Sequence, residues 1–241
     1  MRPLATRRSD ERKPTMTDQG ARKVMPNNIF GDLPEIPAKA PPSRRGIARK
    51  NAIIDAALAV VGQVGIAGLS MRVVAAQAGI PLAAVGYYFA GKDDLINVAF
   101  ERHIQRETAR ITRTITRMGD SPTAAILADR LGDFVVGGLT ESREQLLAEY
   151  EFTIAAVRRA SLAEASAAWQ TMLNAQLQAV VGALGSPSPN TDARLILAVL
   201  AGLEIDQLAA ALDASRIADI RDVLRRLMAA LEPTWTADSD A

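Results

Sequence analysis

The stretch GIAGLSMRVVAAQAGIPLAAVGYYFAG, residues 65–91, decides the fold. Ser70 lies where the N-cap of a helix belongs, and Gly79 lies where that helix would end. Pro81 can occupy the first turn of a second helix, because the N–H that proline lacks would have no intrahelical partner there. The two predicted helices cover about 71–78 and 81–87. Two short helices joined by a tight turn are the helix-turn-helix plan of DNA-binding proteins.

The second of these helices is suited to a close approach to a grooved partner. Its small residues are Ala83, Ala84 and Gly86. Three of the chain's ten aromatic residues follow in a row, at Tyr87, Tyr88 and Phe89. A fully buried run would not need two adjacent hydroxyl groups, so we expect at least one tyrosine to face a polar partner.

Helical periodicity continues on both sides of this stretch, without the alternation typical of strands. A helix is predicted before it, over about 46–63, and six helices after it, over about 92–118, 122–138, 142–158, 161–184, 191–212 and 215–231. The fold class is therefore all-α. We expect residues 44–91 to form the helix-turn-helix domain and residues 92–232 to form a second helical domain. Proline-rich and polar composition predicts a disordered basic tail over 1–43, and a short disordered tail is expected over 233–241.

The net charge of +1 conceals an uneven distribution. Residues 1–50 hold 12 basic and five acidic residues, a net +7, whereas the remaining chain has 16 basic and 22 acidic residues, a net −6. Between 44 and 92 there are six basic residues against Asp55 as the only acid. This balance favours double-stranded DNA as the partner of the amino-terminal part.

Several classes of protein are disfavoured by composition. The chain has no Cys and only one histidine, His103, which argues against a metal site, a disulfide scaffold and a thiol nucleophile. We expect His103 to lie on the surface of the helix over 92–118. No catalytic triad or phosphate-binding glycine loop is recognisable, so we expect no enzyme activity and no cofactor. No apolar stretch reaches the length of a membrane span and no signal peptide is recognisable, which predicts a soluble, cytoplasmic protein without a membrane partner.

The stretch around the helix-turn-helix resembles the TetR family of transcriptional regulators. The resemblance covers about 44–100 and is carried by Ile54, Ala56, Ala57, Gly65, Leu69, Ser70, Arg72, Val73, Ala75, Ala78, Gly79, Ile80, Tyr87, Tyr88, Phe89, Lys92, Asp94 and Leu95. It implies an amino-terminal domain of three helices in which the helix over 81–87 enters the major groove. Beyond residue 100 only the all-helical pattern and the length match the family.

The resemblance also implies which residues meet DNA. Ser70, Arg72, Tyr87 and Lys92 match positions that contact phosphate. Arg44, Arg45 and Arg49 match an arm that places arginine in the minor groove, although they could equally be a solvated helix start. The candidate DNA-binding residues are therefore Arg44, Arg45, Arg49, Ser70, Arg72, Pro81, Leu82, Ala83, Tyr87, Tyr88 and Lys92.

The predicted recognition helix departs from the family pattern. Many members have Ser or Thr in place of Pro81, and larger polar residues in place of Leu82, Ala83 and Ala84. Without Arg, Asn or Gln the helix lacks the side chains that read bases with two hydrogen bonds. Contacts with thymine methyl groups and the shape of the DNA would then carry more of the specificity.

The carboxyl-terminal helices contain candidate ligand-binding residues. Phe134, Tyr150, Trp169, Met172 and Glu204 would line a pocket for an unknown small-molecule effector, or would form ordinary bundle core. Glu149 or Glu151 could also orient a polar or cationic ligand.

The helices over 191–231 contain small residues that permit close helix–helix contact. The resemblance implies that the last two helices form a four-helix homodimer interface, although they could instead close the monomer's own core. We therefore expect a ligand-responsive repressor that binds a palindromic operator as a homodimer. Two alternatives stay open: a helical enzyme or ligand carrier without DNA binding, and a protein-interaction module that has lost operator recognition.

Overall fold

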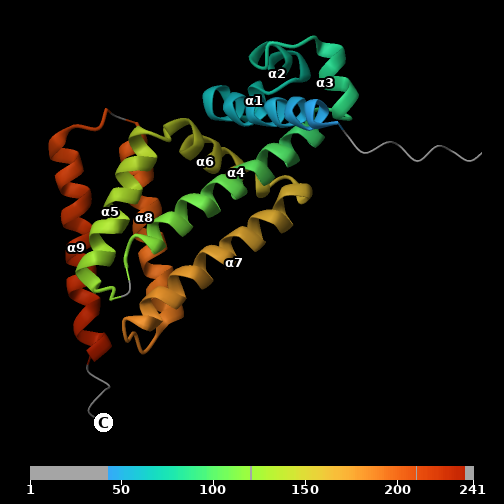
Figure 1. Cartoon of the computed structure of the whole chain (residues 1–241). Helices are drawn as coiled ribbons and strands as arrows, with labels where there is room; N and C mark the ends of the chain where they lie inside the picture. The colour runs from blue at the N-terminus through green and yellow to red at the C-terminus, as the bar shows by residue number, and fades with distance from the viewer. Residues whose placement is uncertain (1–42, 120, 210, 237–241) are drawn as a thin grey trace, which may run out of the picture. The chain divides into compact units, whose positions relative to one another are not determined.

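A computed structural model describes residues 43–119, 121–209 and 211–236. Within these ranges the chain forms nine α-helices and no strand, as the sequence predicts (Figure 1). The predicted tail over 1–43 lies outside the described residues except for Ser43.

The amino-terminal unit is built from three helices, α1 (Arg44–Gly68), α2 (Met71–Gln77) and α3 (Leu82–Tyr88). The Ser43 side chain caps α1 by accepting a hydrogen bond from the backbone N–H of Gly46. The helix runs past its predicted end at residue 63, with a kink at Gly65, where φ is +71°. Glycine adopts this left-handed conformation at little cost, so the break expected there appears as a kink.

The fourth helix, α4 (Lys92–Thr116), packs against α1, α6 and α7. Its inner face joins α1, α2 and α3 in one apolar core. The fully or almost fully buried members of this core include Ile53, Val74, Val85, Leu95 and Phe152. Because Phe152 belongs to α6, the same core holds the helix-turn-helix to the rest of the chain.

Five further helices follow α4 in the described part of the chain. They are α5 (Ala124–Thr140), α6 (Arg143–Ala156), α7 (Ala160–Ala183), α8 (Pro189–Leu208) and α9 (Ala214–Thr236). Helix α5 packs on α9 and α8, and α7 packs on α8. A second apolar core includes Val135, Val181, Ile196 and Ile220.

The predicted start of the carboxyl-terminal tail, at residue 233, is wrong. Helix α9 continues to Thr236, and the Trp235 side chain is buried. Its indole N–H donates to the buried Asp192 carboxylate at 2.7 Å. This anchor explains why the helix outlasts the amphipathic pattern from which its end was predicted; residues 237–241 lie outside the described residues.

The expectation that His103 lies on the surface is wrong. The side chain is fully buried on the inner face of α4, in contact with the rings of Phe100, Phe152 and Trp169. Its charged neighbours Glu101 and Arg102 suggested an exposed position, but the helical phase that buries Phe100 also turns His103 inward.

One described helix, α1, is long and apolar enough to pass for a membrane span. Half of that apolar window is buried against neighbouring helices. The apolar composition of α1 is therefore explained by its place in the core.

Candidate DNA interface and ligand cavity

The helix-turn-helix is held by local caps and one buried anchor. Ser70 caps α2 by accepting a hydrogen bond from the Val73 backbone N–H at 3.3 Å. Gly79 turns the chain with a φ of +65°, and Pro81 is the N-cap of α3. Val85 is the buried residue of α3 and fixes the helix on the core.

The outer face of α3 is small and largely apolar. Pro81 and Ala83 are exposed, and Leu82 is 45% exposed. No atom of the described residues lies within 4 Å of where a Cβ on Gly86 would project, so the helix backbone there is open to a partner. Tyr87 is 73% exposed, whereas Tyr88 is half-buried, with its ring edge-on to Tyr87 at 5.0 Å.

Basic side chains lie on both sides of this face in the sequence. Arg72 in α2 and Arg49 in α1 are exposed. Arg44 and Arg45 are also exposed, but they form the first turn of α1 and not the extended arm that the family resemblance implies. Lys92 is half-buried, and its ammonium donates to the Ala67 carbonyl at 3.2 Å, which ties the start of α4 to the end of α1.

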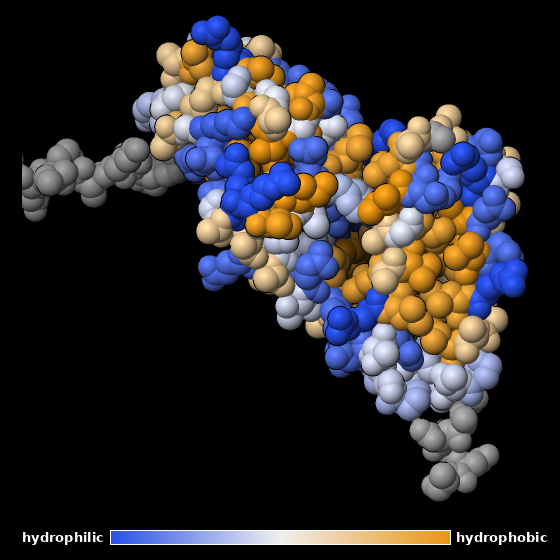
Figure 2. Space-filling view, turned by 180° about the vertical axis from the view of Figure 1, so that it is seen from behind, coloured by the Kyte–Doolittle hydropathy of each residue, from blue (hydrophilic) through white to orange (hydrophobic). Residues whose placement is uncertain are grey.

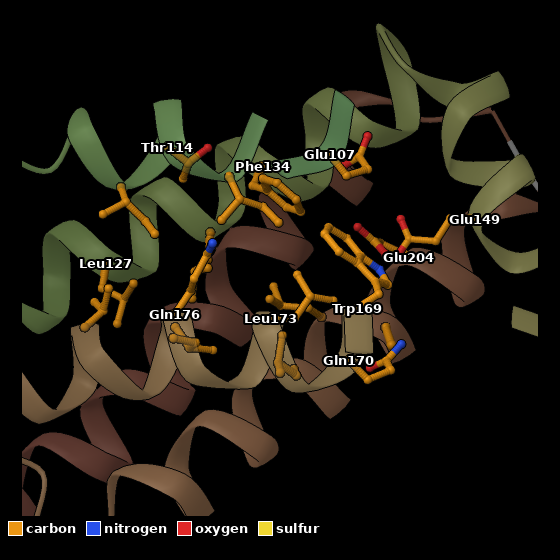
Figure 3. Close-up of a pocket in the computed structure, with 18 of the residues that line it drawn as sticks. Glu107, Thr114, Leu127, Phe134, Glu149, Trp169, Gln170, Leu173, Gln176 and Glu204 are labelled. Carbon is orange, nitrogen blue, oxygen red and sulfur yellow. The ribbon is translucent and has the colours of Figure 1, made fainter. Parts of the chain in front are cut away.

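The second candidate site is a cavity of about 240 Å³ lined by residues of α4, α5, α6, α7 and α8 (Figure 3). Four of the five predicted ligand-binding residues line it: Phe134, Tyr150, Trp169 and Glu204. Met172 does not. Its sulfur accepts a hydrogen bond from Gln176 Nε2 at 3.0 Å, beside the stripe of α7 residues that faces the cavity.

One end of the cavity is polar. The Tyr150 hydroxyl lies 2.9 Å from Glu204 Oε2, to which it donates, and 3.3 Å from the Ala201 carbonyl. Glu107 accepts a hydrogen bond from Arg110 Nε at 2.7 Å. Leu127 lies at the other end of the cavity (Figure 3). The apolar residues that line the cavity also include Ile111, Ile115, Met118, Leu131, Leu177 and Val180.

Burial changes the ionisation of two groups at the polar end. It raises the pKa of Glu204 from its ordinary value of 4.5 to about 7, and repulsion from the Glu149 carboxylate adds to the shift. Burial also raises the pKa of Tyr150, helped by the neighbouring charge of Glu204. Tyr150 therefore stays a neutral donor, while Glu204 can gain or lose a proton near neutral pH.

Several cavity residues are not apparent from the sequence. Glu107, Thr114 and Gln176 line the cavity, yet polar residues within a helix give no signal of their own direction. Four α7 residues that line the cavity do share a helical spacing: Trp169, Leu173, Gln176 and Val180. This spacing is a signal in the sequence for the side of α7 that faces the cavity. Of the two other glutamates considered, Glu149 lines the cavity, whereas Glu151 faces α1.

An amino-terminal helix-turn-helix joined to a helical bundle with an internal cavity defines a class, the helix-turn-helix regulators with a carboxyl-terminal helical domain. Residues 53–99 match the family described as bacterial regulatory proteins, tetR family. Residues 122–230 match the family described as Tetracyclin repressor-like, C-terminal domain.

Solved structures of two other proteins are similar to this chain. The multidrug binding protein EbrR, solved in complex with imidazole, is 36% identical, with 74% of this chain and 94% of that chain covered and a TM-score of 0.54. A transcriptional regulator from Rhodococcus sp. Rha1 shares the fold, with 24% identity, 75% and 94% coverage and a TM-score of 0.64. This chain belongs to the TetR family of transcriptional regulators.

A curated relative is the nicotine-responsive transcriptional repressor HdnoR of Paenarthrobacter nicotinovorans. It is 32% identical over 111 residues, which is 46% of this chain. The matched segment spans 55% of that relative, about half of its length.

Proposed function

We propose that this chain is a ligand-responsive transcriptional repressor that binds a palindromic operator as a homodimer in the cytoplasm. The observation that carries the proposal is the exposed, largely apolar face of α3, together with exposed arginines on α1 and α2 of the same helix-turn-helix unit. HdnoR, which is named as a repressor, supports the direction of regulation. The proposal includes no catalytic step.

The DNA-binding part of the proposal rests on shape and charge. The open backbone at Gly86 and the small side chain of Ala83 allow α3 to lie deep in a major groove. Arg72 and Arg49 would then pair with phosphates, which supply most of the affinity but little sequence information. Leu82, which is exposed, would then contact thymine methyl groups.

The homodimer part rests on an apolar surface over α8 and α9 (Figure 2). Leu195, Ile205 and Val223 are exposed there, with Ile205 57% exposed. Exposed apolar area of this kind is typical of an interface between subunits. A twofold dimer would present two α3 helices to two half-sites about one helical turn apart.

Helix α4 would transmit the effect of a bound ligand from the cavity to the helix-turn-helix. Helix α4 begins beside the helix-turn-helix at Lys92 and contributes Glu107 to the cavity. A ligand that prefers the conformation in which the two α3 helices are wrongly spaced would lower the affinity for the operator.

Selection of bound duplexes from a random pool, using the full chain, tests the proposal. We expect a palindromic site, and we expect Leu82→Glu to abolish its binding because a carboxylate would face the DNA. Val157→Glu, at the exposed end of α6, is the matched control and should bind normally. A chain that enriches no duplex would instead be a helical ligand-binding or protein-interaction module, the alternative that the apolar α3 favours.

A further inference from the structure

Three carboxylates gather at the polar end of the cavity. Glu107 comes from α4, Glu149 from α6 and Glu204 from α8. Figure 3 shows the Glu149 and Glu204 side chains near the Trp169 ring. Among the described residues that line the cavity there is no lysine or arginine. Like charges buried together are costly unless a cation compensates them.

The positive groups nearby are already engaged. Arg110 donates to Glu107 at 2.7 Å and to the Phe134 carbonyl at 2.9 Å, and its guanidinium lies 3.4 Å from the centre of the Phe134 ring. Its charge compensates Glu107 directly and also favours the charged form of Glu204, but it does not outweigh the burial that raises the pKa of Glu204. Glu149 Oε2 lies 3.6 Å from His103 Nε2, and the Glu204 contact with Tyr150 comes from a neutral hydroxyl.

An independent sign of a missing group is Trp169. Its side chain lines the cavity and is 4% exposed, yet its indole N–H has no hydrogen-bond partner within the described part of the chain. Buried donors are seldom left unpaired without a ligand or a water molecule. The unpaired N–H therefore indicates only that a ligand or a water molecule can lie here. The ring face bears on the charge of that ligand, because a tryptophan ring attracts cations better than the rings of tyrosine and phenylalanine.

We infer that the cavity binds a lipophilic organic monocation, with its positive charge between Glu204, Glu149 and the Trp169 ring and its apolar body at the aliphatic end. The inference rests on the proposed function, because it names the ligand class of the same cavity. An anionic ligand would meet the carboxylates without a compensating base. A neutral ligand would bring no positive charge to Glu149 and Glu204, which no described lysine or arginine contacts directly.

We expect a ligand with one positive charge because of the groups that face Glu204. These are Glu107 and Arg110 from α4 and Glu149 and Tyr150 from α6, while α5 and α7 present the uncharged rings of Phe134 and Trp169. With a pKa of about 7, Glu204 holds a proton in part of the molecules at neutral pH. A cation would displace that proton, so one positive charge replaces another.

The test compares N-methylquinolinium with 1-methylnaphthalene, which share a shape and differ by one positive charge. Calorimetry with the full chain at pH 8 should show the cation binding at least about tenfold more tightly. Glu204→Gln and Glu149→Gln should each weaken cation binding about tenfold. Glu101→Gln, on the exposed side of α4, is the matched control and should have no effect.

A second readout is the proton. Binding to the unaltered chain should release protons and should strengthen from pH 6 to pH 8, and both effects should be lost in Glu204→Gln. The non-planar cation benzyltrimethylammonium is tested as a second cation. The inference would be overturned if N-methylquinolinium and 1-methylnaphthalene bound with equal affinity. It would also be overturned if neither of the two cations bound. Duplex selection without ligand tests the proposed function separately, so specific DNA binding with no preference for cations would overturn only the ligand class.

Discussion

Glu151 Oε2 on α6 accepts a hydrogen bond from the backbone N–H of Ile66 in α1 at 3.0 Å. The bond falls directly after the kink at Gly65, where α1 leads into the helix-turn-helix. The preceding residue, Tyr150, faces the cavity and donates to Glu204. Adjacent residues of α6 therefore connect the cavity and the DNA-binding unit through a single helix turn.

Replacing Glu151 by alanine should destabilise the chain, because the part-buried N–H of Ile66 would lose its acceptor. An unsatisfied donor of this kind costs about 1–3 kcal/mol. The measurement is the free energy of unfolding in urea, with Glu164→Ala on the exposed side of α7 as the control. If both variants unfold at the same urea concentration, the Glu151 bond does not hold α1 to α6.

A second contact between α1 and α6 depends on a missing side chain. A Cβ on Gly62 would clash with the Glu144 carbonyl oxygen at a separation of 2.2 Å. No rotamer change can relieve this clash, because the oxygen belongs to the backbone. Gly62→Ala should therefore force the helices apart and lower the free energy of unfolding by about 1–3 kcal/mol.

Gly137→Ala in α5 is the matched control for this change. Within the described part of the chain no atom lies within 4 Å of where its Cβ would project, so Gly137→Ala should be neutral or stabilising. A Gly62→Ala variant as stable as Gly137→Ala would contradict the close packing of α1 on α6.

Arg72 is the exposed base of α2 and should pair with a phosphate in the operator complex. Arg72→Ala should weaken binding at all sequences to a similar extent. The slope of log K against log salt should fall in magnitude by about 0.9. Gel-shift titrations at several salt concentrations measure it, with Arg113→Ala in the last turn of α4 as the control; an unchanged slope would remove Arg72 from the DNA face.

Ile205 should be part of the subunit interface. Ile205→Glu, which places a carboxylate at an exposed apolar position of α8, should convert the dimer to monomers and so lower operator affinity. Sedimentation velocity measures the first effect and gel shift the second. Ile154→Glu, on an exposed position of α6, should remain dimeric, and a dimeric Ile205→Glu would place the interface elsewhere.

Glu204 should make the ligand-free protein less stable as pH rises. Its pKa is about 7 in the folded chain and 4.5 ordinarily, so the folded state binds more protons between these values. Stability is then lost on raising the pH from about 4.5 to about 7 and stays constant for this group above that range. Urea unfolding at pH 5 and pH 8 should show a smaller pH difference for Glu204→Gln than for the unaltered chain; equal differences would contradict the shift.

The helix-turn-helix could be predicted from the sequence because its signals are local. Ser70, Gly79 and Pro81 act on the backbone within one or two turns, and they end and begin helices whatever surrounds them. The family resemblance adds the roles of these helices, which no spacing supplies. The prediction fails where an end depends on a distant partner, as at Trp235, which is held by Asp192.

The cavity was only partly predictable. Aromatic residues such as Phe134 and Trp169 gave a compositional signal, and four of the five proposed residues line the cavity. The prediction that Met172 lines the cavity is wrong. A small rotation about the α7 axis separates the residues that face the cavity from their neighbours, and composition does not fix that rotation.

The sequence by itself determined the all-α class, the helix-turn-helix and the basic amino-terminal balance, since these depend on local propensity, periodicity and composition. Only the tertiary structure decided that Glu107, Glu149 and Glu204 meet at one end of a cavity and that His103 is buried. Those facts depend on how five helices are rotated and packed against one another. Contacts between residues far apart in the chain set these rotations, and the pattern of a single helix does not contain them.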